Sequence, residues 1–282
     1  MLLEMAIADS YGAAFEFIEK PYPDGLVNDG ETYQKHPELV IGNGHYTDDT
    51  QMAIAIAEEL LADGDFSKES LAERFVTTFH CDPRPGYGKR FHQLLLETTS
   101  GSDLLAKIDS NSTRSGGVMR VGPVGLLPDL SDVLDRARKQ AIITHDTPEA
   151  IMSARAIAAA SHYLYYSLGP TRDLGDWLEE TVPGWAWSLP FAEWASVHAI
   201  PVAHAALTAF RTGKTLREIM MVAVDQGGDV DTTAALAVWM GALTPTKKND
   251  LPSSLYVGLE TGPYGHMFLS SLDAKLRAKF PR

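Results

Sequence analysis

Two clusters of aspartate and threonine have the composition of a binding site for a divalent cation. The first occupies residues 47–50 (Thr-Asp-Asp-Thr) and the second occupies residues 227–233 (Gly-Gly-Asp-Val-Asp-Thr-Thr). Neighbouring carboxylates repel one another, and a shared cation is the simplest way to keep them ionised. Carboxylate and hydroxyl oxygens are hard ligands that suit Mg²⁺ or Mn²⁺ better than Zn²⁺. The two clusters therefore predict two halves of one metal site.

The same residue types also begin ordinary helices, so a structural interpretation stands beside the metal site. Threonine and aspartate cap free N–H groups and complement the helix dipole, and both clusters open alanine-rich runs. Each cluster, however, holds more acid than capping requires, and the two share one composition. Together these features favour a shared metal site over two independent caps.

A third acidic segment, residues 9–17, lies near the start of the chain and is otherwise apolar. It places Glu16 one helical face away from Asp9. Charged residues on an apolar face are rarely fully buried without a partner, and a metal would provide one. The alternative is that Glu16 marks the end of a helix and points to water.

Helical periodicity recurs along the whole sequence, whereas the alternation typical of strands is missing. Ser67, and Thr147 followed by Pro148, are typical helix-start residues. We therefore expect an all-α fold in which residues 1–282 form one domain. The predicted helices cover residues 48–63, 67–80, 88–99, 131–143, 148–166, 196–211, 215–224, 230–243 and 266–279.

Several longer connections between these helices have the composition of binding loops rather than of tight turns. They are residues 21–44, 83–88 and 111–117, and a further irregular stretch at 181–190 holds two of the five tryptophans. We expect contacts to a ligand outside the acidic clusters to come from these irregular segments.

Composition narrows the class of protein. The 282 residues include 24 basic and 37 acidic side chains, for a net charge of −13, which disfavours general binding to a nucleic-acid backbone. Cys81 is the only cysteine, so no intrachain disulfide is expected and a reducing cytoplasm is favoured; a small buried residue is its simplest role. We find neither a signal peptide nor a run of the ~18 apolar residues that cross a membrane.

The motifs, in their order along the chain, resemble those of the ADP-ribosylglycohydrolase family. This family includes dinitrogenase-reductase-activating glycohydrolases and ADP-ribosyl-acceptor hydrolases, and the resemblance covers nearly the whole chain. The matching motifs are Asp-Ser-Tyr-Gly at 9–12 with Glu16, Tyr-Thr-Asp-Asp-Thr-Gln-Met at 46–52, Ser-Gly-Gly-Val-Met-Arg at 115–120, Thr-His at 144–145 with Pro148, and Gly-Gly-Asp-Val-Asp-Thr at 227–232. The two acidic motifs in combination are the specific part of the resemblance.

The resemblance implies a compact, orthogonal multi-helix fold around a central binuclear site for two divalent cations, Mg²⁺ or Mn²⁺. Glu16 is implied to lie close to the metals, and the implied ligands are Thr47, Asp48, Asp49, Asp229, Asp231 and Thr232. Two cations in such a site can orient ribose hydroxyls and a water, while carboxylates stabilise an oxocarbenium-like state.

The activity implied by the resemblance is hydrolysis of the glycosidic bond between the distal ribose of ADP-ribose and an acceptor. The substrate would be an ADP-ribosylated protein or small molecule, and ADP-ribose would be the product. Arginine, serine, a nucleic-acid base and a small molecule all stay open as the acceptor. Asp48 and Asp229 would act in catalysis as metal ligands, which leaves Glu16 as the expected general acid or base. Asp82 is a weaker candidate, because a loop aspartate before a proline usually forms a turn.

Ser115, Gly116 and Gly117 precede an apolar run, so their amides have the placement of a diphosphate cradle at a helix N-terminus. A tight turn is the structural alternative. The family commonly has Asn-Gly-Ser-Ala where this chain has Ser-Gly-Gly-Val, which predicts altered side-chain contacts to phosphate or acceptor. His145 lines the site by resemblance, or else is a local hydrogen-bond partner at a helix start.

Aromatic residues in the loops are candidates for stacking on adenine. Tyr87, between two glycines, is one of them, and Trp185 or Trp187 is another. Core or loop packing is the commoner role for any single one of these side chains.

Two other functions remain open from the sequence. One is a non-catalytic, crystallin-like member that binds ADP-ribose, although the full set of metal-ligand types argues against it. The other is a metal-dependent hydrolase of a different nucleotide-like substrate, which the altered loop at Ser115 keeps open.

Overall fold

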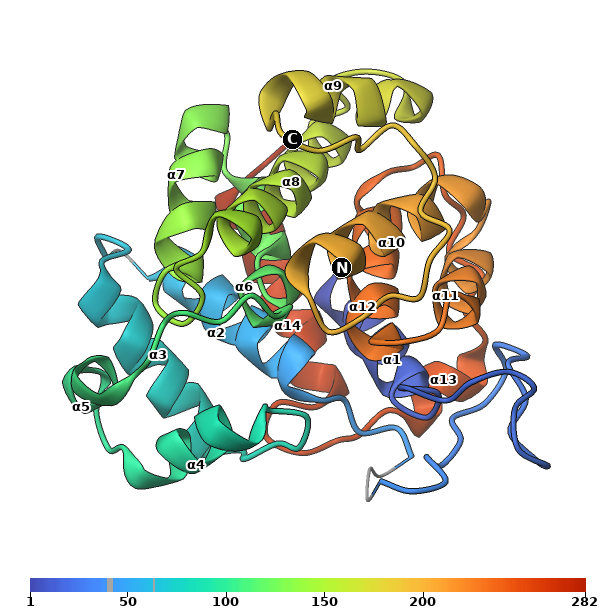
Figure 1. Cartoon of the computed structure of the whole chain (residues 1–282), viewed down its shortest axis with the longest axis horizontal. Coiled ribbons are helices and arrows are strands. Elements are labelled where there is room, and N and C mark those ends of the chain that lie inside the picture. The colour runs from blue at the N-terminus through green and yellow to red at the C-terminus, as the bar shows by residue number, and fades with distance from the viewer. Residues whose placement is uncertain (40–42, 63) are drawn as a thin grey trace.

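The computed structural model describes residues 1–39, 43–62 and 64–282. Within these ranges the chain forms helices joined by loops, and extended segments pair only as isolated bridges (Figure 1). The all-α prediction is confirmed. The helices are α1 (Leu2–Gly12), α2 (Asp48–Leu61), α3 (Lys68–Cys81), α4 (Lys89–Glu97), α5 (Gly101–Lys107), α6 (Gly116–Met119), η1 (Gly122–Leu126, 3₁₀), α7 (Leu130–Ala141), α8 (Pro148–Tyr165), η2 (Thr171–Asp173, 3₁₀), α9 (Leu174–Thr181), α10 (Ala199–Thr212), α11 (Leu216–Asp225), α12 (Val230–Leu243), α13 (Ser253–Gly258) and α14 (His266–Lys279).

Every helix expected from periodicity is present, with bounds within a few residues of the prediction. The periodicity did not reveal α1, α5, α6, α9 and α13. Helix α1 is buried on nearly every face, so it lacks the apolar stripe on which the method depends. The other four are short, and a short helix shows too few turns for a period to stand out.

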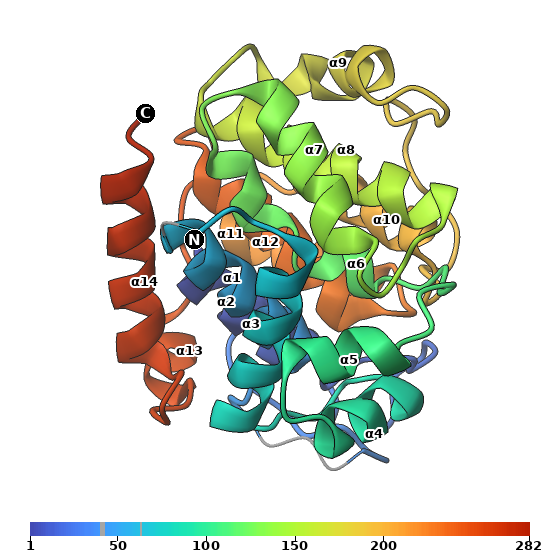
Figure 2. The same ribbon diagram turned by 90° about the vertical axis from the view of Figure 1, so that its left-hand side faces the viewer.

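Helix α12 is the centre of the molecule. All its residues from Val230 to Gly241 are buried, and it contacts α1, α2, α8, α10 and α11, which surround it in Figures 1 and 2. A helix that is apolar on every side belongs in the core. Its alanines let neighbouring helices approach closely, and its one tryptophan, Trp239, donates its Nε1 proton to Ser161 Oγ at 3.0 Å.

Close contact between α1 and α12 depends on Gly12. A Cβ atom at this position would lie 2.7 Å from the carbonyl oxygen of Val230 and 2.8 Å from the Cα of Asp231. Any other residue would push the two helices apart. Because Asp9 belongs to α1 and Asp231 to the first turn of α12, the same contact sets the distance between two acidic motifs.

The remaining helices cover this centre. Helix α14 packs against α1 and α2 along one side of the molecule, as Figure 2 shows, and α5 and α4 pack against α3. The predicted binding segment 21–44 is irregular in its described part. Its residues 40–42, and residue 63 of the predicted helix 48–63, lie outside the described residues.

The environment of Cys81 differs from the expectation of a buried residue. The expected burial is not observed, because Cys81 is the last residue of α3 and lies with His80 on its exposed side, while Phe79 is the last residue of this helix to be buried. Among the described helices, none is both long and apolar enough to cross a membrane.

Replacement of Gly12 by alanine tests the importance of the α1–α12 contact. We expect the Gly12→Ala variant to lose about 1–3 kcal/mol of unfolding free energy, the usual cost of overpacking a tight core. Denaturant unfolding measures this loss. Gly262→Ala is the matched control, because the nearest atom to its new Cβ would lie 3.8 Å away. Equal stability of the two variants would contradict the close-contact argument.

Candidate metal centre

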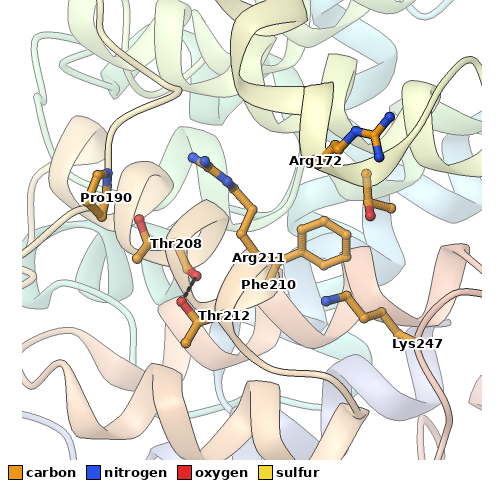
Figure 3. Close-up of a pocket in the computed structure, with 8 residues that line it drawn as sticks. Arg172, Pro190, Thr208, Phe210, Arg211, Thr212 and Lys247 are labelled. Atoms are coloured by element: carbon orange, nitrogen blue, oxygen red, sulfur yellow. Dashed lines mark hydrogen bonds between the residues drawn. The ribbon is translucent and has the colours of Figure 1, made fainter.

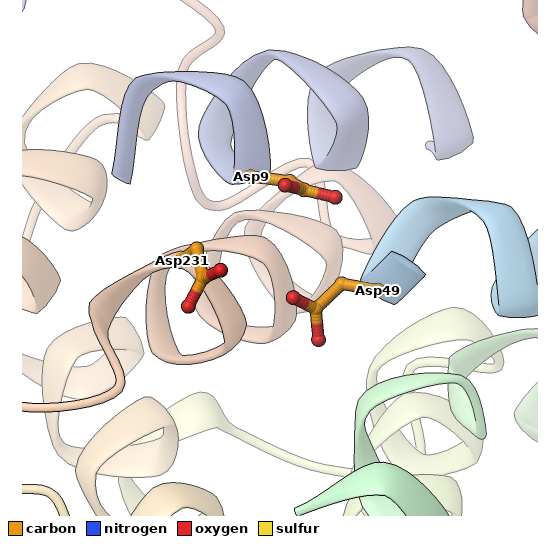
Figure 4. Close-up of side chains that lie close together, drawn as sticks. All are labelled: Asp9, Asp49 and Asp231. Atoms are coloured by element: carbon orange, nitrogen blue, oxygen red, sulfur yellow. The ribbon is translucent and has the colours of Figure 1, made fainter. Parts of the chain in front are cut away.

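Three acidic motifs that are far apart in the sequence meet at the ends of three helices. Asp9 comes from α1, Asp49 from the first turn of α2 and Asp231 from the first turn of α12, and their carboxylates converge in Figure 4. These three residues each offer one oxygen within 4.8 Å of the others, as do Glu16, Asp229 and Asp231. Two trios that share Asp231 form adjacent sites, which is the arrangement a pair of cations requires.

Asp9 fixes the first acidic motif in place. Its Oδ1 accepts the amide and hydroxyl protons of Thr47, both at 2.9 Å, and its Oδ2 accepts those of Thr50 at 3.0 and 2.6 Å. The carboxylate is completely buried. Asp9 lies outside the ligand set that the family resemblance implies. Its position in a segment that is apolar apart from Asp9, Ser10 and Glu16 was the available signal for a buried role.

Threonine hydroxyls orient the carboxylate of Asp49. Thr232 Oγ1 donates to Asp49 Oδ1 at 2.8 Å, and Thr47 Oγ1 lies 3.0 Å from Asp49 Oδ2. Thr47 is also the N-cap of α2, because its hydroxyl accepts the Asp49 amide proton at 3.4 Å. The capping interpretation and the metal-site interpretation are therefore compatible, since a hydroxyl that donates its proton keeps lone pairs for a cation.

The glycine pair before Asp229 makes the turn that aims this carboxylate. Gly227 and Gly228 have φ values of 71° and 92°, a region that side chains other than glycine disfavour. A Cβ on Gly228 would also clash with the carbonyl oxygen of Ala195, which accepts the Asp229 amide proton at 2.7 Å. The turn thus anchors the start of α12 to the segment before α10.

The expected helical relation between Glu16 and Asp9 is wrong, because the two residues do not lie on the same helix. Helix α1 ends at Gly12, and residues 13–17 form turns. The next residue, Phe17, donates its amide proton to Gly228 O at 2.9 Å, which ties this segment to the turn before Asp229. Glu16 is half-buried and is brought to the acidic cluster by tertiary contacts rather than by helical spacing.

Within the described residues, no basic side chain forms an ion pair with the acidic cluster, although the charge of Asp48 acts on the buried Arg120. Among the described residues, no ion pair includes Asp9, Glu16, Asp48, Asp49, Asp229 or Asp231. Burial raises the pKa of Asp49 and Asp231 well above the ordinary value, and the neighbouring carboxylates raise it further. Burial, with the charges of Asp229 and Asp9, raises the pKa of Glu16 to about 8. A divalent cation is the partner that fits this donor set.

Asp48 lies beside this cluster but in neither trio. Its amide donates to Pro85 O at 3.1 Å, and its carboxylate fills the space where Gly86 would carry a side chain. Burial and the charges of Asp9 and Glu16 raise its pKa well above the usual range. Its placement connects the predicted loop at 83–88 with the acidic cluster, while its role as a ligand stays a prediction.

The loop at 111–117 and His145 also meet at this site. Ser115 Oγ donates to Asp229 Oδ2 at 2.8 Å, and the short helix α6 begins at the next residue, Gly116. The His145 ring lies against the backbone of Gly116 and Gly117, since a Cβ on Gly116 would be 2.6 Å from the ring Cε1. The predicted loop residues are therefore next to one another and next to Asp229.

The three aromatic residues considered for stacking on adenine differ in their exposure. Tyr87 is 8% exposed, and its hydroxyl donates to Gln51 Oε1 at 2.8 Å while its ring stacks on that of His92; direct contact with a ligand stays a prediction. Trp187 is fully buried, so stacking on adenine is wrong for this residue. Trp185 is 41% exposed, so its ring is accessible and its stacking on adenine stays a prediction.

Asp82, the weaker candidate for proton transfer, belongs to neither carboxylate trio of the acidic cluster. Asp82 forms an ion pair with the buried Arg84, which gives it a structural partner.

A pocket of about 350 Å³ lies around the C-terminal end of α10 (Figure 3) and contains none of the predicted site residues. Two of its basic groups, Arg211 and Lys247, already donate to backbone carbonyls.

Comparison with known proteins agrees with this geometry. A family model described as ADP-ribosylglycohydrolase matches residues 1–272. An ADP-ribosylhydrolase of Xenopus tropicalis is 33% identical over 172 residues, which are 57% of this chain and 48% of that protein, so the match spans about half of the relative. The ADP-ribosyl-dinitrogen reductase glycohydrolase of Rhodospirillum rubrum is 25% identical over 99% of this chain and 91% of its own length.

The fold has a counterpart among solved structures. A chain described as an ADP-ribosylglycohydrolase-related protein complex superposes with a TM-score of 0.77 and 24% sequence identity. The superposition covers 98% of this chain and 95% of the other. The compact multi-helix architecture expected from the sequence is thereby confirmed.

Substitution of Asp49 by asparagine separates repulsion from cation binding. We expect the Asp49→Asn variant, measured with a chelator, to melt about 2–4 °C above the unsubstituted protein, because removing about 1 kcal/mol of repulsion has this effect in a chain of this size. We also expect it to lose most of the rise in melting temperature that saturating Mn²⁺ produces through mass action. Asp24→Asn, at an exposed loop position, is the control and should change neither quantity.

The raised carboxyl pKa values predict a pH dependence of the metal-free protein. Above about pH 4.5 unfolded Glu16 releases its proton, while folded Glu16 keeps it up to about pH 8. The unfolded state therefore binds fewer protons in this range, and stability falls as the pH rises. Thermal melts in chelator across this range measure the slope, which saturating Mn²⁺ should reduce. A flat profile would contradict the raised pKa.

Proposed function

Because the chain belongs to the ADP-ribosylglycohydrolase family, we propose that it hydrolyses the glycosidic bond between ADP-ribose and an acceptor in a reaction that requires divalent cations. The observation that carries this proposal is a cluster of carboxyl groups, five of which form the two trios while that of Asp48 lies beside them. None of them forms an ion pair with a basic side chain among the described residues. They come from three sequence motifs and converge on the first turns of α2 and α12. Such a cluster is stable as a set of anions only around cations.

The donor set indicates which residues would hold the cations. We assign this role to Thr47, Asp48, Asp49, Asp229, Asp231 and Thr232, all of them buried. Asp9 supports these ligands indirectly, since its four hydrogen bonds hold Thr47 and Thr50 in position. When bound, Mg²⁺ or Mn²⁺ supplies Lewis-acid stabilisation of ribose oxygens and lowers the pKa of a water.

Glu16 is our assignment for the proton transfer. Its carboxyl lies within reach of Asp229 and Asp231 but is only half-buried, so it faces both the acidic cluster and solvent. Its raised pKa, about 8, lies near neutral pH, where a group can both give and take a proton efficiently. Glu16 would hand its proton to the departing acceptor atom and recover one from the attacking water.

The loop at 115–117 is our assignment for the diphosphate. The first amides of a helix have no acceptor within the helix, and here these amides belong to Gly116 and Gly117 at the start of α6. The ring of His145 lies against them. Because Ser115 donates to Asp229, a diphosphate held by this loop would place the attached ribose next to the acidic cluster.

The reaction then balances as a simple hydrolysis. The water oxygen forms a bond to the anomeric carbon of the distal ribose while the bond from that carbon to the acceptor nitrogen or oxygen breaks. One water proton ends on the acceptor, with Glu16 as the carrier. The nearby carboxylates stabilise the positive charge that develops on the ribose ring.

Release of free ADP-ribose tests the proposed function. The substrates are peptides mono-ADP-ribosylated on arginine or on serine, assayed with Mg²⁺, with Mn²⁺ and with a chelator. We expect release from at least one peptide, and loss of that release in chelator. ADP-ribose binding without release from any substrate would favour the non-catalytic alternative, and release of inorganic phosphate would favour hydrolysis of another nucleotide-like substrate.

The role of Glu16 is tested in the same assay. Glu16→Gln should lower kcat about 10²- to 10⁴-fold, the usual contribution of general acid–base catalysis. It should reduce the Mn²⁺-dependent rise in melting temperature less than Asp49→Asn does, because Glu16 is only half-buried and lies outside the assigned ligand set although it borders Asp229 and Asp231. Glu19→Gln is the matched control, because Glu19 lies nearby in the chain and is exposed. Full activity of Glu16→Gln would assign the proton transfer to another group.

A further inference from the structure

Arg120 is a fully buried cation that has no carboxylate partner within the described residues. It is 1% exposed, and its guanidinium donates to Gln140 Oε1 at 2.7 Å, to Gln140 O at 2.9 Å and to Thr144 Oγ1 at 2.8 Å. Its Cζ atom lies 4.5 Å from the centre of the Phe75 ring. The charge of Asp48 also acts on Arg120, but no carboxylate accepts a hydrogen bond from it among the described residues. Burial of an arginine whose hydrogen-bond acceptors are all neutral is costly, so its position calls for a role beyond packing.

The two residues that accept hydrogen bonds from Arg120 in turn contact the loop that we assign to the diphosphate and the adjacent His145. Gln140 Nε2 donates to Gly117 O at 2.7 Å, which holds the loop from one side. Thr144 Oγ1 lies 2.6 Å from His145 Nδ1, which holds the imidazole from the other. Arg120 thus contacts, through Gln140 and Thr144, both the loop at 115–117 and the ring of His145.

The direction of each hydrogen bond follows from the donors available. Arginine can only donate, so Thr144 Oγ1 accepts from Arg120 and its own proton remains for the bond to His145. Burial lowers the pKa of His145 to about 3, with Arg120 and Arg114 adding to the effect, so the ring is neutral at neutral pH. A neutral ring that accepts at Nδ1 carries its proton on Nε2.

We propose that Arg120 and Thr144 are positioning residues that hold His145 as the neutral tautomer protonated on Nε2. This Nε2–H is presented beside Gly116 as a fixed donor to an oxygen of the bound substrate. The identity of that substrate as a nucleoside diphosphate rests on the proposed function, whereas the tautomer does not.

The glycine at position 116 fits this arrangement. A Cβ there would lie 2.6 Å from Cε1 and 3.0 Å from Nε2 of His145, but 3.6 Å from Nδ1. The Nε2 edge of the ring therefore faces the loop, and the Nδ1 edge faces Thr144. A neutral donor also suits a site full of carboxylates, because it places no second cation that would compete with the metals for them.

The tautomer is measured directly by NMR of the full chain with ¹⁵N-labelled histidine. The sequence contains nine histidines, and the signals of His145 are those missing from the His145→Gln spectrum. In long-range ¹H–¹⁵N correlations at neutral pH, we expect a protonated Nε2 and a bare Nδ1. A protonated Nδ1, or an imidazolium, would overturn the proposal.

Two substitutions of Thr144 test the relay. Thr144→Val removes the hydroxyl at nearly constant volume and should let both tautomers appear, while Thr144→Ser should restore the single tautomer. With ADP-ribose as the probe in calorimetry, we expect Thr144→Val to bind about 2- to 10-fold more weakly, the usual effect of one lost hydrogen bond, and Thr144→Ser to recover. An unchanged tautomer in a folded Thr144→Val protein would overturn the role of Thr144.

Two substitutions of His145 locate the donor. The amide nitrogen of glutamine reaches the place of Nε2, whereas that of asparagine reaches only the place of Nδ1. We expect His145→Gln to bind ADP-ribose more tightly than His145→Asn, and the reverse order would overturn the assignment. The NMR result is independent of turnover, so a protein that fails to hydrolyse any ADP-ribosylated peptide would refute the proposed function without affecting this test.

Discussion

Mutual repulsion among buried carboxylates is the constraint on which this structure depends. Asp49 and Asp231 are almost completely buried, no basic side chain in the described chain pairs with them, and their pKa values are raised accordingly. A flexible framework would relieve this repulsion by moving the acids apart. The helices therefore have to hold the acids together when no cation is present, and a cation held there, as we propose, would turn the repulsion into attraction.

Buried contacts between the helices hold the acidic side chains at fixed positions. Gly12 brings α1 into contact with the first turn of α12, and the turn at Gly228 is closed against Ala195. Asp9 joins α1 to the start of α2 through four hydrogen bonds. Because all of these contacts are buried, the positions of the carboxylates are set by the core rather than by exposed loops.

Contacts around the acidic cluster extend this order to the neighbouring loops. Ser115 connects the loop at 115–117 to Asp229, and Gln140 connects the same loop to the buried Arg120. The loop carries the Ser-Gly-Gly-Val variant of the family motif, yet its serine still bonds to the cluster. Hydrogen bonds thus tie this loop to the acidic cluster on one side and to the buried Arg120 on the other.

The sequence by itself determined the helical class, because amphipathic helices such as α7 and α11 show their period directly. It also identified most of the acidic residues that the fold brings together, because two clusters held more aspartate than helix capping requires. It did not reveal α1, which is buried on nearly every face and so carries no periodic signal. Nor did local spacing place Glu16, which reaches the cluster through turns after Gly12, or the exposed Cys81. Only the tertiary structure decided which residues face one another, because burial and electrostatic coupling depend on contacts between segments that are distant in sequence.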